Sequence, residues 1–286
     1  FPSKVEEQAN AIAQNVDPNE IKKRMDFRDI FTLTIDPLDA RDFDDALSVQ
    51  KINDDEWEIG VHIADVSYYV QLNSALDKEA RKRGNSTYLV GEVVPMLPQS
   101  LSNGICSLVE GQDRLVKSVL FRFRNDGKMV SSKLAECVIN SNKRLTYEQA
   151  ILFLRGNRLE SIKEAKPPSS RYSGNPGKPL QEVSSEELKQ INQTIQRLWS
   201  IASKLRTERM RAGSLNLESA EIKILVDSKG EPEKILSSEN DESHQLVEEF
   251  MLLANETVAK HIRNKKLKGI FRVHPEPCLL YTSPSP

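Results

Sequence analysis

Apolar residues alternate with polar ones, or gather in short runs, along much of the first half of the chain. Segments 31–35 and 46–49 are rich in β-prone residues and lie on either side of an acidic stretch. Segment 57–64 is apolar at alternate positions and follows a run of turn residues, so it is predicted to form a hairpin with the strand before it. Further strands are predicted at 116–123 and 129–140, around an Asn-Asp-Gly turn. These segments predict a mainly antiparallel sheet.

A second pattern, with apolar residues three or four positions apart, predicts helices. Residues 1–29 begin with this pattern, which ends at an Asp-Pro-Asn sequence. Longer helices are predicted at 184–213 and 243–264, and a shorter one at 146–154. Ser184 and Glu187 have the spacing of a capping box, and Gly213 suits the end of the same helix. The order of these segments predicts an α+β fold in which a mostly antiparallel sheet is flanked by helices.

The same patterns indicate how the chain is divided. Residues 1–29 are interpreted as a helical linker into one domain that spans 30–274. Prolines and glycines crowd into 165–183, a stretch with little to bury, so a mobile insertion is expected there. Residues 275–286 continue no periodicity, and we expect them to form a tail outside the domain.

Composition and charge favour a globular protein over a membrane protein. Hydrophobic residues make up 38% of the 286 positions and charged residues 29%, and no run approaches the roughly 18 apolar residues of a membrane span. The three cysteines are widely spaced, so neither a disulfide framework nor a zinc site is expected, and a reducing, cytoplasmic setting fits best. The net charge of −2 gives no nucleic-acid signal, which leaves any such contact to basic clusters at 81–83 and 263–268.

Five aspartates fall within ten residues after the first predicted strand of this region: Asp36, Asp39, Asp42, Asp44 and Asp45. Like charges gathered at a strand end raise each other's pKa, so such a loop is stable when cations neutralise it or when the side chains splay into water. Hard oxygen ligands of this type select Mg²⁺ or Mn²⁺. Two such ions about 4 Å apart activate water and stabilise the leaving oxygen in phosphodiester hydrolysis.

Other interpretations of these residues stay open or are excluded. Asx turns and helix caps would also use aspartates, without any metal. A calcium loop of the EF-hand type is excluded because its glycine and glutamate positions are unmatched. The four histidines show no metal-ligand spacing, and His62, inside a predicted strand, is interpreted as a buried structural residue. The chain has no GxSxG sequence for a serine nucleophile.

Residues 34–47, with the sequence TIDPLDARDFDDAL, resemble the signature of the RNase II/RNase R (RNB) family, in which a D-x5-D-x-DD pattern binds magnesium. Further strings follow in the family's order: HIADVSYYV at 62–70, VPMLP at 94–98, LSNGICSL at 101–108 and EEFMLLAN at 248–255. The resemblance covers residues 1–274 and is closer to the ribonuclease R branch than to ribonuclease II. It implies that 30–274 is an RNB catalytic domain that is incomplete at its C-terminal end.

The resemblance also implies roles for particular residues. Asp36, Asp42, Asp44 and Asp45 match the family's metal-binding aspartates, and Asp44 has the place most directly tied to cleavage. Tyr88 matches an aromatic residue that stacks on the 3′-terminal base of RNA, and a core tyrosine is the alternative.

The resemblance implies that a second set of residues recognises the terminal ribose. Tyr147 and one of the neighbours Glu248 and Glu249 match positions that the family uses near this ribose. Adjacent helix residues point about 100° apart, so we expect one glutamate to face the site and the other to be solvated.

Two features of the sequence depart from the family pattern. Leu217 stands where a second stacking aromatic is common, and a later arginine at the scissile phosphate would lie beyond residue 274.

The implied function is processive 3′→5′ hydrolysis of single-stranded RNA to nucleoside 5′-monophosphates, with Mg²⁺ (or Mn²⁺) as cofactor and water as nucleophile. Single-stranded RNA is then the expected partner of a monomer that uses neither a membrane nor a small-molecule cofactor. The main alternative is an RNA-binding fragment or regulator without catalysis, because some members of the family keep the fold and lose the aspartates. A metal-dependent DNA nuclease is a second alternative, and it would not need to recognise the ribose.

Overall fold

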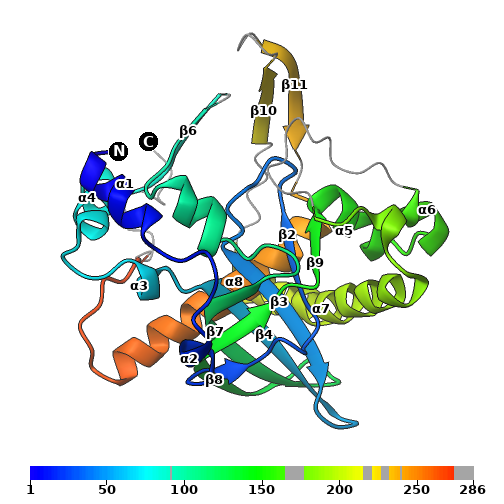
Figure 1. The fold of residues 1–286 in the computed structure, drawn as a ribbon. Coiled ribbons are helices and arrows are strands. Elements are labelled where there is room, and N and C mark those ends of the chain that lie inside the picture. The colour runs from blue at the N-terminus through cyan, green and yellow to red at the C-terminus, as the bar shows by residue number, and fades with distance from the viewer. Residues whose placement is uncertain (91, 165–176, 215–220, 227–231, 239, 274–286) are drawn as a thin grey trace, which may run out of the picture.

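The computed structural model describes residues 1–90, 92–164, 177–214, 221–226, 232–238 and 240–273. Its centre is a seven-stranded sheet with the strand order β1-β8-β7-β4-β3-β2-β9 (Figure 1). In that order the strands are Met25–Asp26, Met129–Asn140, Asp113–Arg124, Glu56–Ala64, Asp45–Lys51, Thr32–Asp36 and Lys143–Thr146. The pairs from β8 to β2 are antiparallel, which confirms the mainly antiparallel sheet predicted from the sequence.

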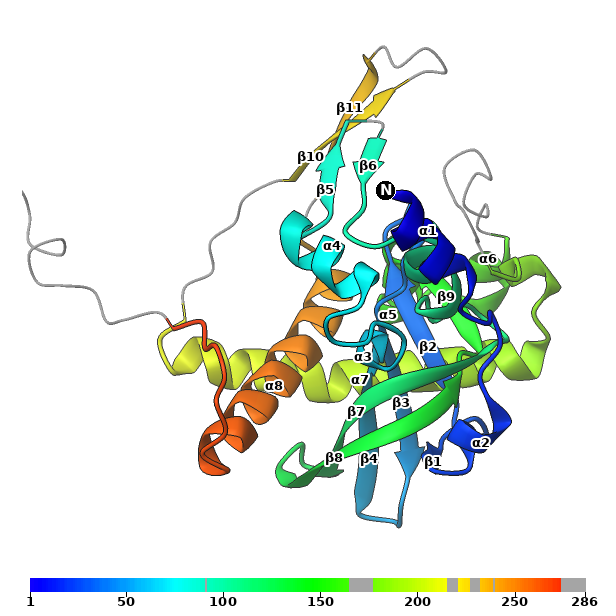
Figure 2. The same cartoon turned by 60° about the vertical axis from the view of Figure 1, so that its left-hand side comes forward.

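Two short parallel strands at the sheet edges were not predicted. β1 pairs with β8, and β9 pairs with β2 so that Thr146 lies opposite Asp36. Strands of two and four residues are too short to show an alternating pattern. Two separate hairpins, β5 (Thr87–Leu89) with β6 (Glu92–Val94) and β10 (Glu221–Val226) with β11 (Pro232–Ser238), project from the same end of the molecule in Figure 1 and Figure 2.

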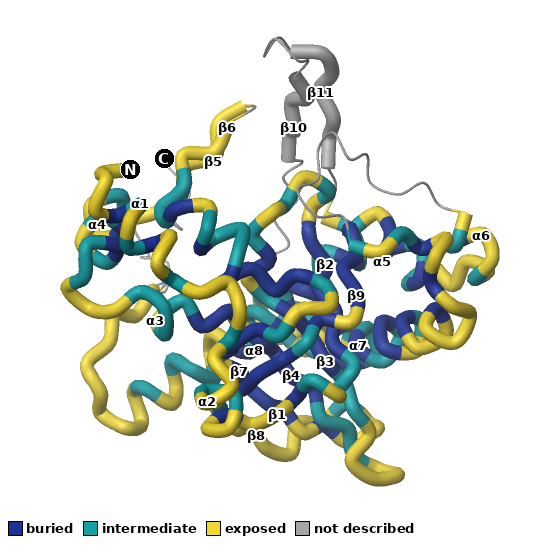
Figure 3. Tube along the Cα trace, viewed as in Figure 1, coloured by how far each residue is buried: buried dark blue, intermediate teal, exposed yellow. Residues whose placement is uncertain are grey.

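Two long helices cover one face of the sheet (Figure 2). They are α7 (Ser185–Arg211) and α8 (Glu242–Asn264), and α5 (Tyr147–Leu154) and α6 (Leu159–Lys163) lie beside them. The predicted capping box of α7 is present. The helices and strands enclose a core that includes the fully buried Ile59, Phe121, Leu198 and Phe250, and Figure 3 shows the buried segments in dark blue.

The opposite face of the sheet carries a second core, and the chain also has several shorter helical elements. These are α1 (Ser3–Asn10), α2 (Pro18–Ile21), α3 (Val66–Tyr69), α4 (Ala75–Arg83) and a π-helical turn at Leu101–Ile105. The second core contains Phe43, Ala46, Leu108 and Leu120. A third, smaller core joins α1 and α4 to the π-helical turn. The first and second cores therefore lie on opposite faces of the sheet.

The N-terminal residues belong to the packed body and do not form the expected linker. Val5 and Ala9 of α1 are buried in the third core, together with Leu76 of α4, and β1 joins the sheet. None of the helices in the described ranges is long and apolar enough to cross a membrane.

The expected mobile insertion at 165–183 is wrong for its last part. Residues 180–182 form a 3₁₀ turn, and Leu180 and Val183 are buried in the first core. Their apolar side chains pack in the first core, a contact that the proline-rich composition did not indicate. Residues 165–176 lie outside the described residues, as do Leu217 and the expected tail 275–286.

Candidate active site

The acidic residues occupy the connection between two central strands. Asp36 is the last residue of β2 and Asp45 the first residue of β3, so the loop 37–44 joins neighbouring antiparallel strands. Phe43, between two aspartates in sequence, is 1% exposed and packs in the second core. Burial of this one aromatic ring anchors the loop and leaves its polar neighbours on the outer side.

Ser107 and Leu108, which follow the π-helical turn, hold one side of the loop. Ser107 Oγ accepts a hydrogen bond from Phe43 N at 3.0 Å and donates one to Arg41 O at 3.1 Å. Leu108 N donates to Phe43 O at 2.9 Å. π-Helical segments often occur at functional sites, and here the two residues shortly after such a segment fix the backbone on both sides of Asp42.

Arg144 of β9 holds the other side. Its Nη2 donates to Pro37 O at 2.7 Å and to Leu38 O at 3.4 Å, and its guanidinium lies over the ring of Phe43, 5.4 Å from the centroid. Its Nε and Nη1 are buried without a hydrogen-bond partner. This buried cation therefore acts on the loop by its backbone contacts and by its charge.

Burial and mutual repulsion raise the pKa of Asp36, Asp44 and Asp45. Burial, followed by the charge of Asp45, raises the pKa of Asp36 to about 8, although Arg144 opposes this shift. Burial and the charge of Asp44 raise the pKa of Asp45 to about 6. The pKa of Asp44 is raised because neighbouring protein atoms reduce its hydration and Asp42 repels it, even though its side chain is exposed. The four carboxylates thus form one electrostatically linked group, in which Asp36 is the most buried member.

The environment of Asp36 fits a cation site. Its side chain is nearly buried, and its Oδ2 has no hydrogen-bond partner. A buried carboxylate without a partner is costly unless a positive charge balances it, and such hard oxygen atoms are preferred ligands of Mg²⁺. In the part of the chain that the structure describes, no three acidic, histidine or cysteine side chains converge as a complete ligand set. The four aspartates lie in one loop and at the strand ends that flank it.

Tyr88 lies beside the acidic loop and outside the core. It belongs to the β5–β6 hairpin and is 65% exposed. Its hydroxyl donates a hydrogen bond to Asp42 Oδ2 at 3.0 Å. This geometry excludes the alternative of a core tyrosine and leaves a ring face available next to the aspartates.

Tyr147 approaches the aspartates from another direction. It is the first residue of α5, directly after Thr146, which lies opposite Asp36 in the sheet. Burial, followed by the charges of Asp36 and Asp45, raises its pKa. The phenol therefore keeps its proton, and its ring stacks on His244 of α8.

The paired glutamates of α8 contact arginines of α7. Glu249 is buried and lies 2.5 Å from Arg209 and 3.7 Å from Arg206. Glu248, with a side chain 38% exposed, lies 3.2 Å from the same Arg209. Both glutamates pair with Arg209, and the expectation that one faces the site while the other is solvated stays a prediction. Glu248 is the more accessible of the two.

Comparison with known proteins assigns the family. A family model described as the RNB domain matches residues 24–279. The chain belongs to the RNB domain family. Ribonuclease R of Thermotoga maritima is 42% identical over 278 residues, which make up 97% of this chain and 36% of that protein. Ribonuclease R of Escherichia coli is 36% identical over 278 residues, 97% of this chain and 31% of that protein.

A solved structure shares the fold of this RNB domain. Mycoplasma genitalium RNase R in complex with ribose methylated single-stranded RNA has a TM-score of 0.81 at 31% identity, over 97% of this chain and 39% of that one. The family and the α+β fold class inferred from the sequence are confirmed. The chain spans about a third of the length of the curated relatives it matches.

Three residues that support the site in this RNB domain were missed in the sequence. Ser107 lies in the family-like string 101–108, which was a usable signal. Arg144 and His244 had no local signal, since only the folded chain brings Arg144 of β9 to the loop and His244 of α8 to Tyr147. His62 is confirmed as structural, because it is fully buried between the hydroxyls of Ser48 at 2.9 Å and Ser118 at 2.7 Å.

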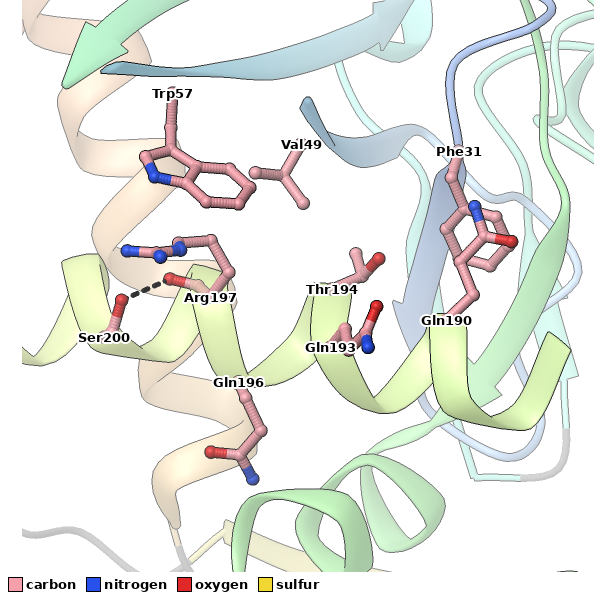
Figure 4. A pocket seen from close by; sticks show the side chains of 9 residues that line it. All are labelled: Phe31, Val49, Trp57, Gln190, Gln193, Thr194, Gln196, Arg197 and Ser200. Atoms are coloured by element: carbon pink, nitrogen blue, oxygen red, sulfur yellow. Dashed lines mark hydrogen bonds between the residues drawn. The ribbon is translucent and has the colours of Figure 1, made fainter. Parts of the chain in front are cut away.

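A separate hollow of about 570 Å³ lies between α7 and the sheet (Figure 4). Arg197 lies over the ring of Trp57, 4.0 Å from its centroid, at one side of this hollow. The lining residues are Phe31, Val49, Trp57, Gln190, Gln193, Thr194, Gln196, Arg197 and Ser200. None of the predicted site residues is among them, so the hollow is not part of the candidate active site.

Proposed function

We propose that this RNB domain is the catalytic domain of a 3′→5′ exoribonuclease, which hydrolyses single-stranded RNA processively to nucleoside 5′-monophosphates. The observation that carries the proposal is the buried, unpartnered oxygen of Asp36 within a group of four linked carboxylates. The ribonuclease R relatives supply the reaction class. The complex of Mycoplasma genitalium RNase R with ribose methylated single-stranded RNA supports the substrate class.

Asp36, Asp42, Asp44 and Asp45 are the residues that would hold Mg²⁺. Two bound Mg²⁺ ions would supply a Lewis acid for the phosphoryl oxygens and a more acidic water. The chain's own task is to keep the four carboxylates in place. Ser107 and Arg144 do this from opposite sides of the loop, by contacts to its backbone.

The neighbouring aromatic residues serve to place the RNA end. The exposed ring of Tyr88, beside Asp42, offers a stacking face for the terminal base, and stacking is tolerant of sequence because every base has a π face. Tyr147, whose hydroxyl stays protonated near Asp36 and Asp45, offers a hydrogen bond to the terminal ribose. This arrangement suits an enzyme that removes successive nucleotides of any sequence.

The test is the product pattern from a uniformly labelled single-stranded RNA with Mg²⁺. We expect the chain to release mononucleotides, and Asp44→Asn to reduce their release by at least about a hundredfold, because it removes a metal-site carboxylate. Asp39→Asn is the matched control, since Asp39 lies in the same loop but outside the family pattern. An all-deoxy strand of the same sequence should yield no mononucleotides.

Each other outcome contradicts a defined part of the proposal. Equal loss in Asp39→Asn and Asp44→Asn would remove the assigned role of Asp44. Cleavage of the all-deoxy strand would favour a nuclease without ribose recognition. If the unmodified chain binds RNA but leaves it intact, the function of this chain is RNA binding without catalysis.

A further inference from the structure

Two rings from separate helices meet beside the aspartates. Tyr147 is the first residue of α5 and His244 the third residue of α8. Their rings are stacked with centroids 3.8 Å apart and planes inclined by 12°. A close parallel contact of this kind restricts both the position and the tilt of each ring. Whatever fixes His244 therefore also fixes the phenol of Tyr147.

His244 is itself held by the residue that starts its helix. Asp241 is the N-cap of α8, and its Oδ1 accepts hydrogen bonds from Ser243 N at 3.0 Å and from His244 Nδ1 at 2.8 Å. Burial alone would raise the pKa of Asp241, but the hydrogen bonds from Ser243 and His244 lower it. Asp241 is thus a charged acceptor that sets the orientation of the imidazole.

Tyr147 contacts this anchored imidazole and also lies within the electrostatic reach of the carboxylates. Its backbone is fixed by the capping box of Thr146 and Gln149 at the start of α5. Its side chain senses the charges of Asp36 and Asp45. The start of α5 fixes the backbone position of Tyr147. The stack on His244 fixes the orientation of its ring and therefore the direction of its hydroxyl group.

We propose that His244 is a positioning residue of the ribonuclease site: it holds the Tyr147 ring, through a stack anchored by Asp241, in the orientation that recognises the terminal ribose. The inference rests on the proposed function, in which Tyr147 contacts that ribose. His244 acts without touching RNA. A hydrogen bond to a 2′-hydroxyl is directional, and supporting side chains must hold its donor within a narrow range of angles.

The test compares two RNA ends under conditions in which the RNA stays intact. All chains carry Asp44→Asn, and they are titrated in Mg²⁺ by fluorescence anisotropy with 5′-labelled single-stranded RNAs that differ only in a terminal ribose or 2′-deoxyribose. The added variants are His244→Ala, His244→Phe and Asp241→Asn. His261→Ala is the matched control, because His261 is an exposed histidine near the other end of α8.

We expect His244→Ala to reduce the ratio of the two affinities by about tenfold, as loss of a supporting partner commonly does. His244→Phe keeps a flat ring and should restore most of the ratio, a rescue that a merely structural role would not predict for ribose discrimination. Asp241→Asn still caps α8 but holds the imidazole less firmly, so its ratio should lie between the two. His261→Ala should leave the ratio unchanged.

A His244→Ala chain that melts cooperatively and keeps the parental ratio overturns the inference and leaves the proposed function intact. Should His244→Ala fail to fold, Asp241→Asn decides in the same way, and an unchanged ratio overturns the inference. If the parental Asp44→Asn chain binds the ribose and 2′-deoxyribose ends with equal affinity, the proposed ribose contact is contradicted. The inference about His244 is then contradicted as well, because it depends on that contact.

Discussion

Arg144 is 1% exposed, and its guanidinium contacts the carbonyl oxygens of Pro37 and Leu38. Arg144→Leu keeps apolar contact with Phe43 but removes these hydrogen bonds and the positive charge near Asp36. Partners that orient metal ligands typically contribute 10–100-fold to activity, so we expect mononucleotide release in Mg²⁺ to fall by about tenfold or more. The control is Arg124→Leu, at an exposed arginine of β7, which should keep the parental rate. A parental rate in Arg144→Leu would show that the loop does not need this contact.

His62 links stability to pH. Burial lowers its pKa from 6.5 to about 3, so the folded chain binds fewer protons than the unfolded chain between these values. Stability from this group is therefore present above pH 6.5 and is lost as the pH falls toward 3. Between pH 7.5 and 5.5 the loss is about 1.4 kcal/mol. Urea unfolding at both pH values measures it.

The contribution of His62 must be separated from that of the aspartates. Asp36 and Asp45 have raised pKa values, so they act in the opposite sense and stabilise the fold as the pH falls through those values. The measured quantity is thus the difference between the parental chain and His62→Gln, without Mg²⁺. His261→Gln, at an exposed histidine, should behave as the parent. An identical pH dependence in His62→Gln and the parent would contradict the assignment.

At the scale of elements, the capping box of α7 contributes to stability. Ser184 Oγ accepts from Glu187 N at 3.1 Å, and Glu187 Oε2 accepts from Ser184 N at 3.0 Å. Ser184→Ala should lower the free energy of unfolding by about 1 kcal/mol. Ser200→Ala, inside the same helix, should change the free energy of unfolding little, because alanine has a high propensity for helix interiors. Thermal unfolding of the two variants checks the contrast, and equal effects would contradict it.

The elements that could be predicted are those with a strong local pattern. Helices α7 and α8 have apolar residues at helical spacing over many turns, and β4 alternates over nine residues. The hairpin β5–β6 was missed because its described residues are exposed on both faces, so no alternation marks it. β9 was missed because it is short and completely buried.

The candidate site could be predicted only in part, for a related reason. The aspartates lie within ten residues of one another in sequence and carry a family pattern, whereas the residues that hold them come from distant elements. Arg144 reaches the loop because β9 pairs in parallel with β2, and His244 reaches Tyr147 because α8 crosses α5. Such contacts depend on tertiary packing, for which a single sequence has no local signal.

At the scale of the whole molecule, Mg²⁺ should stabilise the fold. A ligand at a hundred times its Kd adds roughly 2.7 kcal/mol, so we expect the melting temperature to rise by several degrees in Mg²⁺ at constant ionic strength. Asp36→Asn should melt higher than the parent without metal, because folding no longer has to protonate this buried carboxyl group or bury its charge, and it should lose most of the Mg²⁺ response. Asp39→Asn should keep the response, and a full response in Asp36→Asn would exclude Asp36 from the metal site.

The parallel pairing of β2 with β9 also limits how the chain can change in length during evolution. Thr146 lies opposite Asp36, and Tyr147 follows directly. One residue inserted within β9 would turn every later side chain of the strand to the other face and carry Tyr147 away from the aspartates. The turn between β3 and β4, at the far ends of its strands, has no such constraint. Insertions and deletions should therefore persist in that turn and be eliminated from the stretch 143–147.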